Sequence, residues 1–294
     1  MRNNSDDLLR ELVNILGEQW VSDDPEIIFP HTRDVNLGPR DLDSIMRPPF
    51  YVALPGTPEE LQKVMLIARR YKAPITILAT GINICGIAVP PMGGILVDLK
   101  RLDKIVSIDE ANGTATIQPF VTIARLSCEL QKKGMYIPVP GCPSTAGLIS
   151  NILFGMGLKV ANRVGRQDES IVGFKMILPD GNIIRVGSGA DPMIPKDFWP
   201  WGPGPAMHFL PMYTCGTTGI VFEMTVKCWL RGENYKEFWV GYEDVDKASQ
   251  AAQTLARKDI AKGLNIYSGN KYTSYFTDTR EAMERMVRAL SLIH

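Results

Sequence analysis

The segment from residue 51 to residue 78 constrains the fold most, because it reads as a strand, a helix and a second strand. Residues 51–54 (YVAL) are an apolar run of strand type, and residues 57–60 (TPEE) supply an N-cap, a proline at the first helical position and a capping-box glutamate. Apolar residues then recur at helical spacing as far as Tyr71, and 75–78 (ITIL) is the next strand. The sequence therefore predicts a β-α-β unit with a right-handed connection.

Length and composition indicate a globular protein of two lobes. The chain has 294 residues, 45% hydrophobic and 22% charged, which is near the upper size of a single hydrophobic core and excludes a mostly disordered chain. Lys plus Arg and Asp plus Glu both number 32. Because no strong positive field is available to hold a phosphate backbone, a nucleic-acid partner is not expected.

The remaining pattern predicts an α+β fold in three regions. Residues 1–50 hold a first helix, capped by Ser5 and stopped by Gly17, and an irregular proline-rich arm. Residues 51–231 continue the β-α-β unit with mostly strands, at 95–99, 104–109, 114–119, 171–178, 182–186 and 219–229, and one helix near 122–133. Residues 232–294 begin a new unit with an aromatic strand at 237–243, a helix around Ala248–Leu255 and a helix opened by Asp278.

Cysteine and histidine usage predicts no metal centre. Five cysteines at no C-x-x-C spacing fit neither a disulfide framework nor a zinc or iron–sulfur site, so reduced, mostly buried thiols are expected. Only three histidines are present, and one of them, His294, is the last residue given. The first sixteen residues do not resemble a secretory signal, and no run is apolar enough to span a membrane. We therefore expect a cytoplasmic protein with no transmembrane segment.

Three glycine-rich loops carry the chemistry. Residues 79–90 follow a predicted strand, and their glycines allow backbone amides to converge on an anion, although neither a dinucleotide fingerprint nor a P-loop is present. Residues 140–151 place hydroxyls and amides in an irregular loop, and residues 215–221 bring small residues into a strand. Each loop taken alone also fits an ordinary turn or surface loop. Together they favour one extended ligand.

In order and spacing, these features resemble the FAD-binding domain of the flavoprotein superfamily of vanillyl-alcohol oxidase, 4-cresol dehydrogenase, glycolate oxidase and D-lactate dehydrogenase. The matching segments are LPGTPEELQKVM, ATGINICGIAVPP, GGILVDLKRLDKIVSIDEANGTATIQP, PGCPSTAGLISN, GRQDESIVGFKMILPDGNIIRVGSG and CGTTGIVFEMTVKCWL. The resemblance implies a p-cresol methylhydroxylase-type FAD-binding domain of two α/β subdomains over 51–231, followed by an incomplete cap domain, and FAD as cofactor.

Carried over by position, the resemblance also implies the cofactor-binding residues. The first loop would bind the pyrophosphate through Thr80, Gly81, Ile82, Asn83, Ile84, Cys85 and Gly86. The second loop would line the flavin and ribityl chain through Pro140, Gly141, Ser144, Thr145, Gly147 and Asn151. The third would approach the adenine side through Gly219, Ile220 and Val221. Some relatives anchor FAD through a histidine in the first loop; none is present here, so covalent attachment at this loop is not expected.

The implied activity is dehydrogenation of an alcohol-type substrate, either a 2-hydroxy acid or a phenolic or aryl alcohol. Asn151 matches the asparagine of the phenol-oxidising motif G-N-T-M-D-R-G, but the aspartate of that motif falls near Phe154, which argues against phenolic chemistry. Residues 199–216 resemble the K-W-G-Y-G-P segment of the same branch, which argues for it. Both substrate classes therefore stay open. His208 is a candidate base, with a structural histidine as the alternative. Cys142 fits an inert thiol or a modulator of the flavin, and Trp199 fits core or a pocket.

The resemblance implies partners beyond the small-molecule substrate. No nicotinamide site is visible, so electrons would pass to an acceptor protein or second subunit, and a homo-oligomer is compatible with the sequence. The cap domain that begins near Tyr235 in the family runs beyond this length, so we expect a longer polypeptide or a second subunit docked on 235–294, covering an apolar stripe of Met283, Met286, Val287 and Leu290. A non-catalytic FAD-binding or assembly subunit is the alternative function.

Overall fold

A computed structural model of the chain describes residues 2–32, 51–82, 86–90, 92–139, 141–155, 164–202, 204–232, 236–261, 263–267, 279–282 and 284–285. The chain divides into two compact units. The first consists of Met1–Gly157 and Arg166–Arg231, and the second of Leu158–Gly165 and Gly232–His294. Two sheets, called here sheet A and sheet B, lie in the first unit.

Sheet A confirms the predicted strand-helix-strand segment. Its strand order is β1 (Val21–Ser22), β2 (Tyr51–Ala53), β4 (Ile95–Asp98) and β3 (Ile75–Leu78). β2 and β3 both run parallel to β4, whereas β1 is antiparallel to β2. The helix between β2 and β3 is α3 (Pro58–Tyr71), and the Thr57 hydroxyl oxygen caps it by accepting a hydrogen bond from the Glu60 amide at 3.1 Å. β4 thus lies between the two strands that α3 connects.

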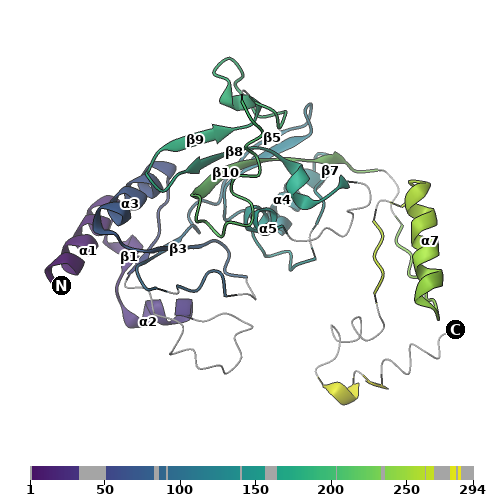
Figure 1. The fold of residues 1–294 in the computed structure, drawn as a ribbon, viewed down its shortest axis with the longest axis horizontal. Coiled ribbons are helices and arrows are strands. Elements are labelled where there is room, and N and C mark those ends of the chain that lie inside the picture. The colour runs from purple at the N-terminus through teal and green to yellow at the C-terminus, as the bar shows by residue number, and fades with distance from the viewer. Residues whose placement is uncertain are drawn as a thin grey trace. The chain divides into compact units, whose positions relative to one another are not determined.

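Helices cover both faces of sheet A (Figure 1). α1 (Arg2–Leu16) and α3 share one apolar core with Ala53 and Val97. On the opposite face, Ile28 of α2 (Pro25–Ile28) packs with Val52 and Leu96. Because successive strand residues point to opposite faces, neighbouring residues of one strand serve different helices.

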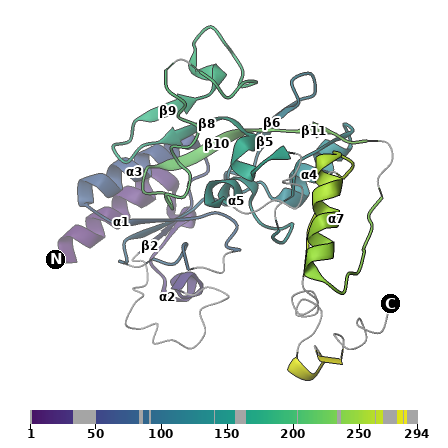
Figure 2. The same cartoon turned by 45° about the vertical axis from the view of Figure 1, so that its right-hand side comes forward.

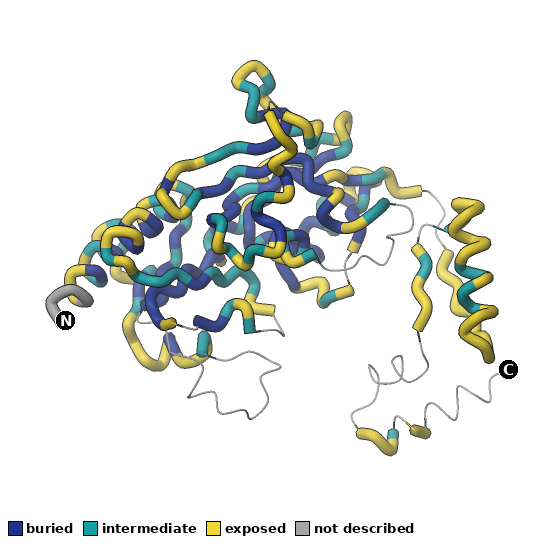
Figure 3. The backbone as a smooth tube through the Cα atoms, in the orientation of Figure 1, coloured by how far each residue is buried: buried dark blue, intermediate teal, exposed yellow. Residues whose placement is uncertain are grey.

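Sheet B is antiparallel, in the order β5 (Ile105–Asp109), β6 (Thr114–Ile117), β10 (Ile220–Lys227), β8 (Ile171–Ile177) and β9 (Ile183–Val186). Two helices pack against one face, α4 (Ile123–Gln131) and α5 (Leu148–Phe154) (Figure 2). A small ladder of β7 (Met135–Tyr136) and β11 (Trp229–Leu230) completes the unit. The buried residues concentrate in the two sheets and the helix faces against them (Figure 3).

Several predicted boundaries are wrong. α1 begins at Arg2, so Ser5 lies inside the helix and does not cap it. The predicted strand at 219–229 is broken into β10 and β11, with Cys228 between them. Among the cysteines that the structure describes, only Cys228 is buried, while Cys128 and Cys215 are exposed and Cys142 is intermediate. The expectation of mostly buried thiols is therefore wrong for the described cysteines.

The second unit has one long described helix, α7 (Val245–Arg257), which confirms the helix predicted around Ala248–Leu255. The strand predicted at 237–243 is wrong, because residues 236–243 form no strand and are exposed. None of the residues of α7 is buried. Asp278 lies outside the described residues, as does the predicted apolar stripe of Met283, Met286, Val287 and Leu290.

Candidate cofactor site

The first loop leaves the carboxyl end of β3, at the edge of sheet A where parallel strands commonly place ligand-binding loops. Gly81 and Gly86 have φ values of +70° and +70°, a conformation that favours glycine. An ideal Cβ at Gly81 would meet only a methyl group of Leu78, at 3.8 Å. This backbone is accessible to a ligand, as a pyrophosphate cradle requires. Ile82 is 42% exposed beside it, while Asn83, Ile84 and Cys85 lie outside the described residues.

The second loop leads into α5 and is anchored to α4. The carbonyl oxygen of Ser144 accepts a hydrogen bond from the Ala124 amide at 2.8 Å, and that of Ala146 accepts one from the Ile123 amide at 3.0 Å. These carbonyls satisfy amides in the first turn of α4, which otherwise lack partners within the helix. The side chains of Ser144 and Thr145 stay exposed. An ideal Cβ at Gly141 would meet nothing within 4 Å among the described atoms, and Pro140 lies outside them.

A hydrogen bond joins the two loops. The Gly147 amide donates to Oγ1 of Thr80 at 2.9 Å. The Gly147 carbonyl oxygen accepts hydrogen bonds from the Ser150 hydroxyl at 3.0 Å and from Nδ2 of Asn151 at 2.7 Å. One N–H of the Asn151 side-chain amide is therefore engaged within the loop. The structure thus brings the first and second predicted loops together.

The third predicted segment lies at the start of β10 and has a structural role of its own. Gly219 has a φ of +139°, and an ideal Cβ there would lie 2.3 Å from the carbonyl oxygen of Ile177, so only glycine lets β10 approach β8. Ile220 and Val221 are 2% and 4% exposed and belong to the apolar core. Ile220 also lines a groove of about 310 Å³ between α3, β3 and residues 215–217.

His208 is buried among aromatic rings. It is 6% exposed, with the Trp201 ring edge-on at 5.2 Å and the Phe209 ring at 4.2 Å between centroids. Burial lowers the pKa of this imidazole below its ordinary value. Among the described residues, its Nδ1 has no hydrogen-bond partner. A neutral imidazole with a free ring nitrogen can accept a proton. The segment that follows His208 contacts the carboxyl end of α5, where the Tyr213 amide donates a hydrogen bond to the Leu153 carbonyl at 2.8 Å.

Gln167 was not identified from the sequence as a candidate site residue. Its side chain is buried, and neither its Nε2 nor its Oε1 has a hydrogen-bond partner in the part of the chain that the structure describes. The neighbouring Asp168 pairs with Arg166 at 2.9 Å, and Arg166 also donates to the Tyr213 hydroxyl. This polar cluster lies beside α5, close to Gly155, where a Cβ would strike the Tyr213 ring. The polar run RQDES before an apolar strand was the available signal.

A search of the described residues finds no cluster of three His, Cys, Asp or Glu side chains suited to a metal ion. Within the same residues, no helix is both long and apolar enough to cross a membrane. The open glycine backbones and the exposed hydroxyls of the first two loops are suited to ligand binding. Their residues fit the phosphates and polar ring edge of a flavin nucleotide.

Comparisons with known proteins agree with this geometry. Residues 49–187 match the family described as "FAD binding domain". The chain is 29% identical over 213 residues to the glycolate oxidase subunit GlcD of Bacillus subtilis, which covers 72% of this chain and 44% of that protein. It is 26% identical over 238 residues to the 4-cresol dehydrogenase [hydroxylating] flavoprotein subunit of Pseudomonas putida, covering 78% and 44%. The chain spans about half the length of these relatives.

A solved structure of p-cresol methylhydroxylase with substrate bound superposes with a TM-score of 0.79 at 20% sequence identity, covering 98% of this chain and 59% of that one. The fold is thus the p-cresol methylhydroxylase type of FAD-binding fold. Through residues 49–187 the chain matches an FAD-binding domain family, and it is similar to the glycolate oxidase subunit GlcD and to the 4-cresol dehydrogenase flavoprotein subunit. Its cofactor is FAD.

Proposed function

We propose that this chain binds FAD between its first and second loops and dehydrogenates an alcohol-type substrate, either a 2-hydroxy acid or a phenolic or aryl alcohol. The observation that carries the proposal is the hydrogen bond between Thr80 and Gly147, because it brings the two loops together across 67 residues. The names of the relatives span both substrate classes, with a glycolate oxidase on one side and a 4-cresol dehydrogenase on the other.

The chain's own residues would hold and orient the cofactor. Open backbone at Gly81 offers amides to the pyrophosphate, and the exposed hydroxyls of Ser144 and Thr145 offer donors and acceptors to the flavin side. When bound, FAD supplies the two-electron acceptor that alcohol dehydrogenation needs. Ile220 and Val221 contribute apolar core next to the groove at the start of β10, and we assign the adenine side to this region.

The proton of the substrate hydroxyl needs an acceptor. His208 is the candidate, since burial lowers the pKa of its imidazole and its Nδ1 has no hydrogen-bond partner among the described residues. A His208→Gln variant keeps a polar side chain but removes the titrating nitrogen. If His208 is the base, the rate of flavin reduction falls at least about 100-fold while the FAD dissociation constant is unchanged. A loss of stability without a change in rate would assign it a structural role.

A second polypeptide would take up the electrons and cover apolar surface. The relative from Pseudomonas putida is named as a flavoprotein subunit. In the second unit of this chain Phe238, Val240 and Val245 are 79%, 67% and 69% exposed, and exposed apolar residues of this kind commonly mark interfaces. An acceptor protein or second subunit that docks on residues 235–294 is part of the proposal, as is a cytoplasmic location.

The alternative is a non-catalytic FAD-binding or assembly subunit. Anaerobic mixing of the FAD-loaded protein with candidate substrates distinguishes the oxidoreductase from the non-catalytic subunit. The substrates are glycolate, the two lactate enantiomers, 4-cresol and vanillyl alcohol. Bleaching of the flavin absorbance near 450 nm, at roughly 1 per second or faster, supports the oxidoreductase and identifies the substrate class. A flavin that dithionite reduces but no substrate does would contradict the oxidoreductase and support the alternative.

A further inference from the structure

The bond between Thr80 and Gly147 connects two separately built parts of the first unit. Thr80 follows β3 of sheet A, and Gly147 is the residue before α5, which packs against sheet B. The bond measures 2.9 Å from the Gly147 nitrogen to Oγ1 of Thr80 and is partly buried. A hydrogen bond shielded from water contributes more than an exposed one, and an amide left without its partner there is costly.

The fit around this bond is close. An ideal Cβ at Gly147 would lie 3.3 Å from the Cγ2 methyl of Thr80 and 3.2 Å from the carbonyl oxygen of Pro119. Gly147 has a φ of −69°, which any residue adopts. A side chain at position 147 would therefore crowd Thr80 and the Pro119 carbonyl, whereas it would not strain the backbone.

The second loop is held against sheet B without any help from Thr80. Its carbonyls at Ser144 and Ala146 accept from the first turn of α4, and the Leu148 amide donates to the Val121 carbonyl at 3.1 Å. The Thr80 hydroxyl instead fixes the distance between this loop and the loop that follows β3. That distance separates the proposed pyrophosphate contacts from the proposed flavin contacts.

We propose that Thr80 is a positioning residue: its hydroxyl sets the spacing of the two FAD loops through the Gly147 amide, instead of binding FAD itself. The inference rests on the proposed FAD site. A ligand held at both ends gains affinity from correct spacing, because its second contact forms within an already bound complex. Loosened spacing therefore weakens a ligand that reaches both loops and spares a ligand that reaches one.

The experiment compares three ligands on three proteins. FAD, ADP and riboflavin are titrated by calorimetry into the apo form of the wild type, Thr80→Val and Thr80→Ser. Valine keeps the shape and removes the acceptor, whereas serine keeps the acceptor. For Thr80→Val we expect the dissociation constant of FAD to rise tenfold or more, which corresponds to about 1.4 kcal/mol, and those of ADP and riboflavin to change less than about twofold. Thr80→Ser should bind all three like the wild type.

A matched control is Thr57→Val, which removes the hydroxyl that caps α3 by accepting from the Glu60 amide at 3.1 Å. It should lower the melting temperature and leave the FAD dissociation constant unchanged. Thr80→Ala provides a second acceptor-free variant if Thr80→Val folds poorly. Equal weakening of ADP and FAD by loss of the Thr80 acceptor would indicate a direct phosphate contact and overturn the proposal, as would unchanged FAD affinity. If FAD binds in this pattern but no substrate reduces it, the positioning role stands and the proposed oxidoreductase function fails.

Discussion

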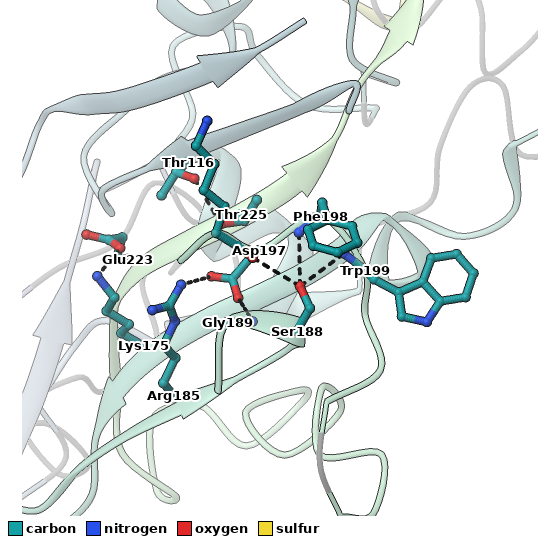
Figure 4. A network of polar contacts seen from close by, with 11 residues as sticks. Thr116, Lys175, Arg185, Ser188, Gly189, Asp197, Phe198, Trp199, Glu223 and Thr225 are labelled. Carbon is teal, nitrogen blue, oxygen red and sulfur yellow. Dashed lines mark hydrogen bonds and ion pairs between the residues drawn. The ribbon is translucent and has the colours of Figure 1, made fainter. Parts of the chain in front are cut away.

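The carboxylate of Asp197 accepts a hydrogen bond of 2.8 Å from the backbone amide of Gly189 and pairs with Arg185 at 3.2 Å (Figure 4). The Asp197 side chain is only 6% exposed. Glycine makes this burial feasible, because an ideal Cβ at Gly189 would lie 2.5 Å from Oδ1 of Asp197 and one at Gly173 would lie 2.7 Å from its Cγ. The carboxylate is thus enclosed by backbone on two sides and by one guanidinium.

The Ser188 hydroxyl closes the same turn from the other end. It accepts hydrogen bonds from the amides of Phe198 and Trp199 at 3.1 and 3.3 Å, as Figure 4 shows, and donates to the Lys196 carbonyl at 3.2 Å. Trp199 itself is 55% exposed. The polar network, rather than burial of the aromatic rings, therefore holds the segment from 188 to 199 in place.

Removing the Asp197 carboxylate should destabilise the first unit. We expect Asp197→Ala to lower the free energy of unfolding by about 3 kcal/mol, since it leaves Arg185 and the Gly189 amide without their acceptor in a buried place. Asp197→Asn keeps an acceptor and should cost less. Urea unfolding followed by circular dichroism measures both.

The control is Asp103→Ala, which breaks an ion pair with Arg125 whose side chains are 46% and 49% exposed. Exposed pairs contribute about 0–1 kcal/mol. Similar losses at Asp103 and Asp197 would show that burial adds nothing to the Asp197 network.

A side chain at position 81 should weaken FAD binding, whereas a side chain at Gly134, a glycine of similar backbone geometry, should not. Gly81 and Gly134 have φ values of +70° and +65°, and a Cβ at Gly134 would meet nothing within 4 Å of the described atoms. Alanine at either position should cost about 1 kcal/mol of stability, because both backbones are left-handed. Only Gly81→Ala should raise the FAD dissociation constant, by tenfold or more. Equal FAD affinity in the two variants would remove the first loop from the pyrophosphate site.

Stability should fall below neutral pH because the pKa values of His31 and His208 are both lowered in the folded protein. Burial lowers the pKa of His208, and burial together with Lys100 lowers that of His31 against an opposing effect of Asp98. The unfolded chain then binds protons at a higher pH than the folded protein. The contribution of these histidines to the free energy of unfolding is therefore greatest above the ordinary histidine pKa of about 6.5, and it decreases as the pH falls through that value.

The measurement is the free energy of unfolding between pH 7.5 and 5.5. His208→Phe and His31→Phe should each flatten part of the pH dependence, and the double variant should flatten more of it. An unchanged slope in His208→Phe would mean that this imidazole titrates normally in the folded protein.

Thiol labelling should distinguish the described cysteines. Burial raises the pKa of the Cys228 thiol to about 12, so at pH 8 only about one part in ten thousand is thiolate, the reactive form. Cys128 and Cys215 are exposed. Peptide mass spectrometry after iodoacetamide treatment of the native protein should find these two alkylated and Cys228 alkylated only after denaturation. Labelling of all three at one rate would contradict the burial of Cys228.

Local chemistry in the sequence determined the strand-helix-strand segment of the first unit and where the first ligand loop begins. The Thr57 cap, the proline after it and the apolar spacing of α3 are short-range signals, so helix and flanking strands were predictable. The glycine at position 81 likewise marked a left-handed backbone after a strand. In contrast, the strand expected at 237–243 was wrong, because alternating aromatic residues make a strand only when a neighbouring strand pairs with them.

Only the tertiary structure decided which distant residues meet. Neither the Thr80 hydroxyl nor the Gly147 amide carries a sign of its partner 67 residues away, and β4 enters between β2 and β3 although it follows both in the chain. The same holds for Gly219, whose lack of a side chain serves the approach of β10 to β8. Hydrogen bonds and van der Waals contacts act over a few ångströms in space, whereas sequence patterns report on neighbours along the chain. The sequence therefore determined the loops and the FAD family, and the packing of two sheets decided how the loops face one another.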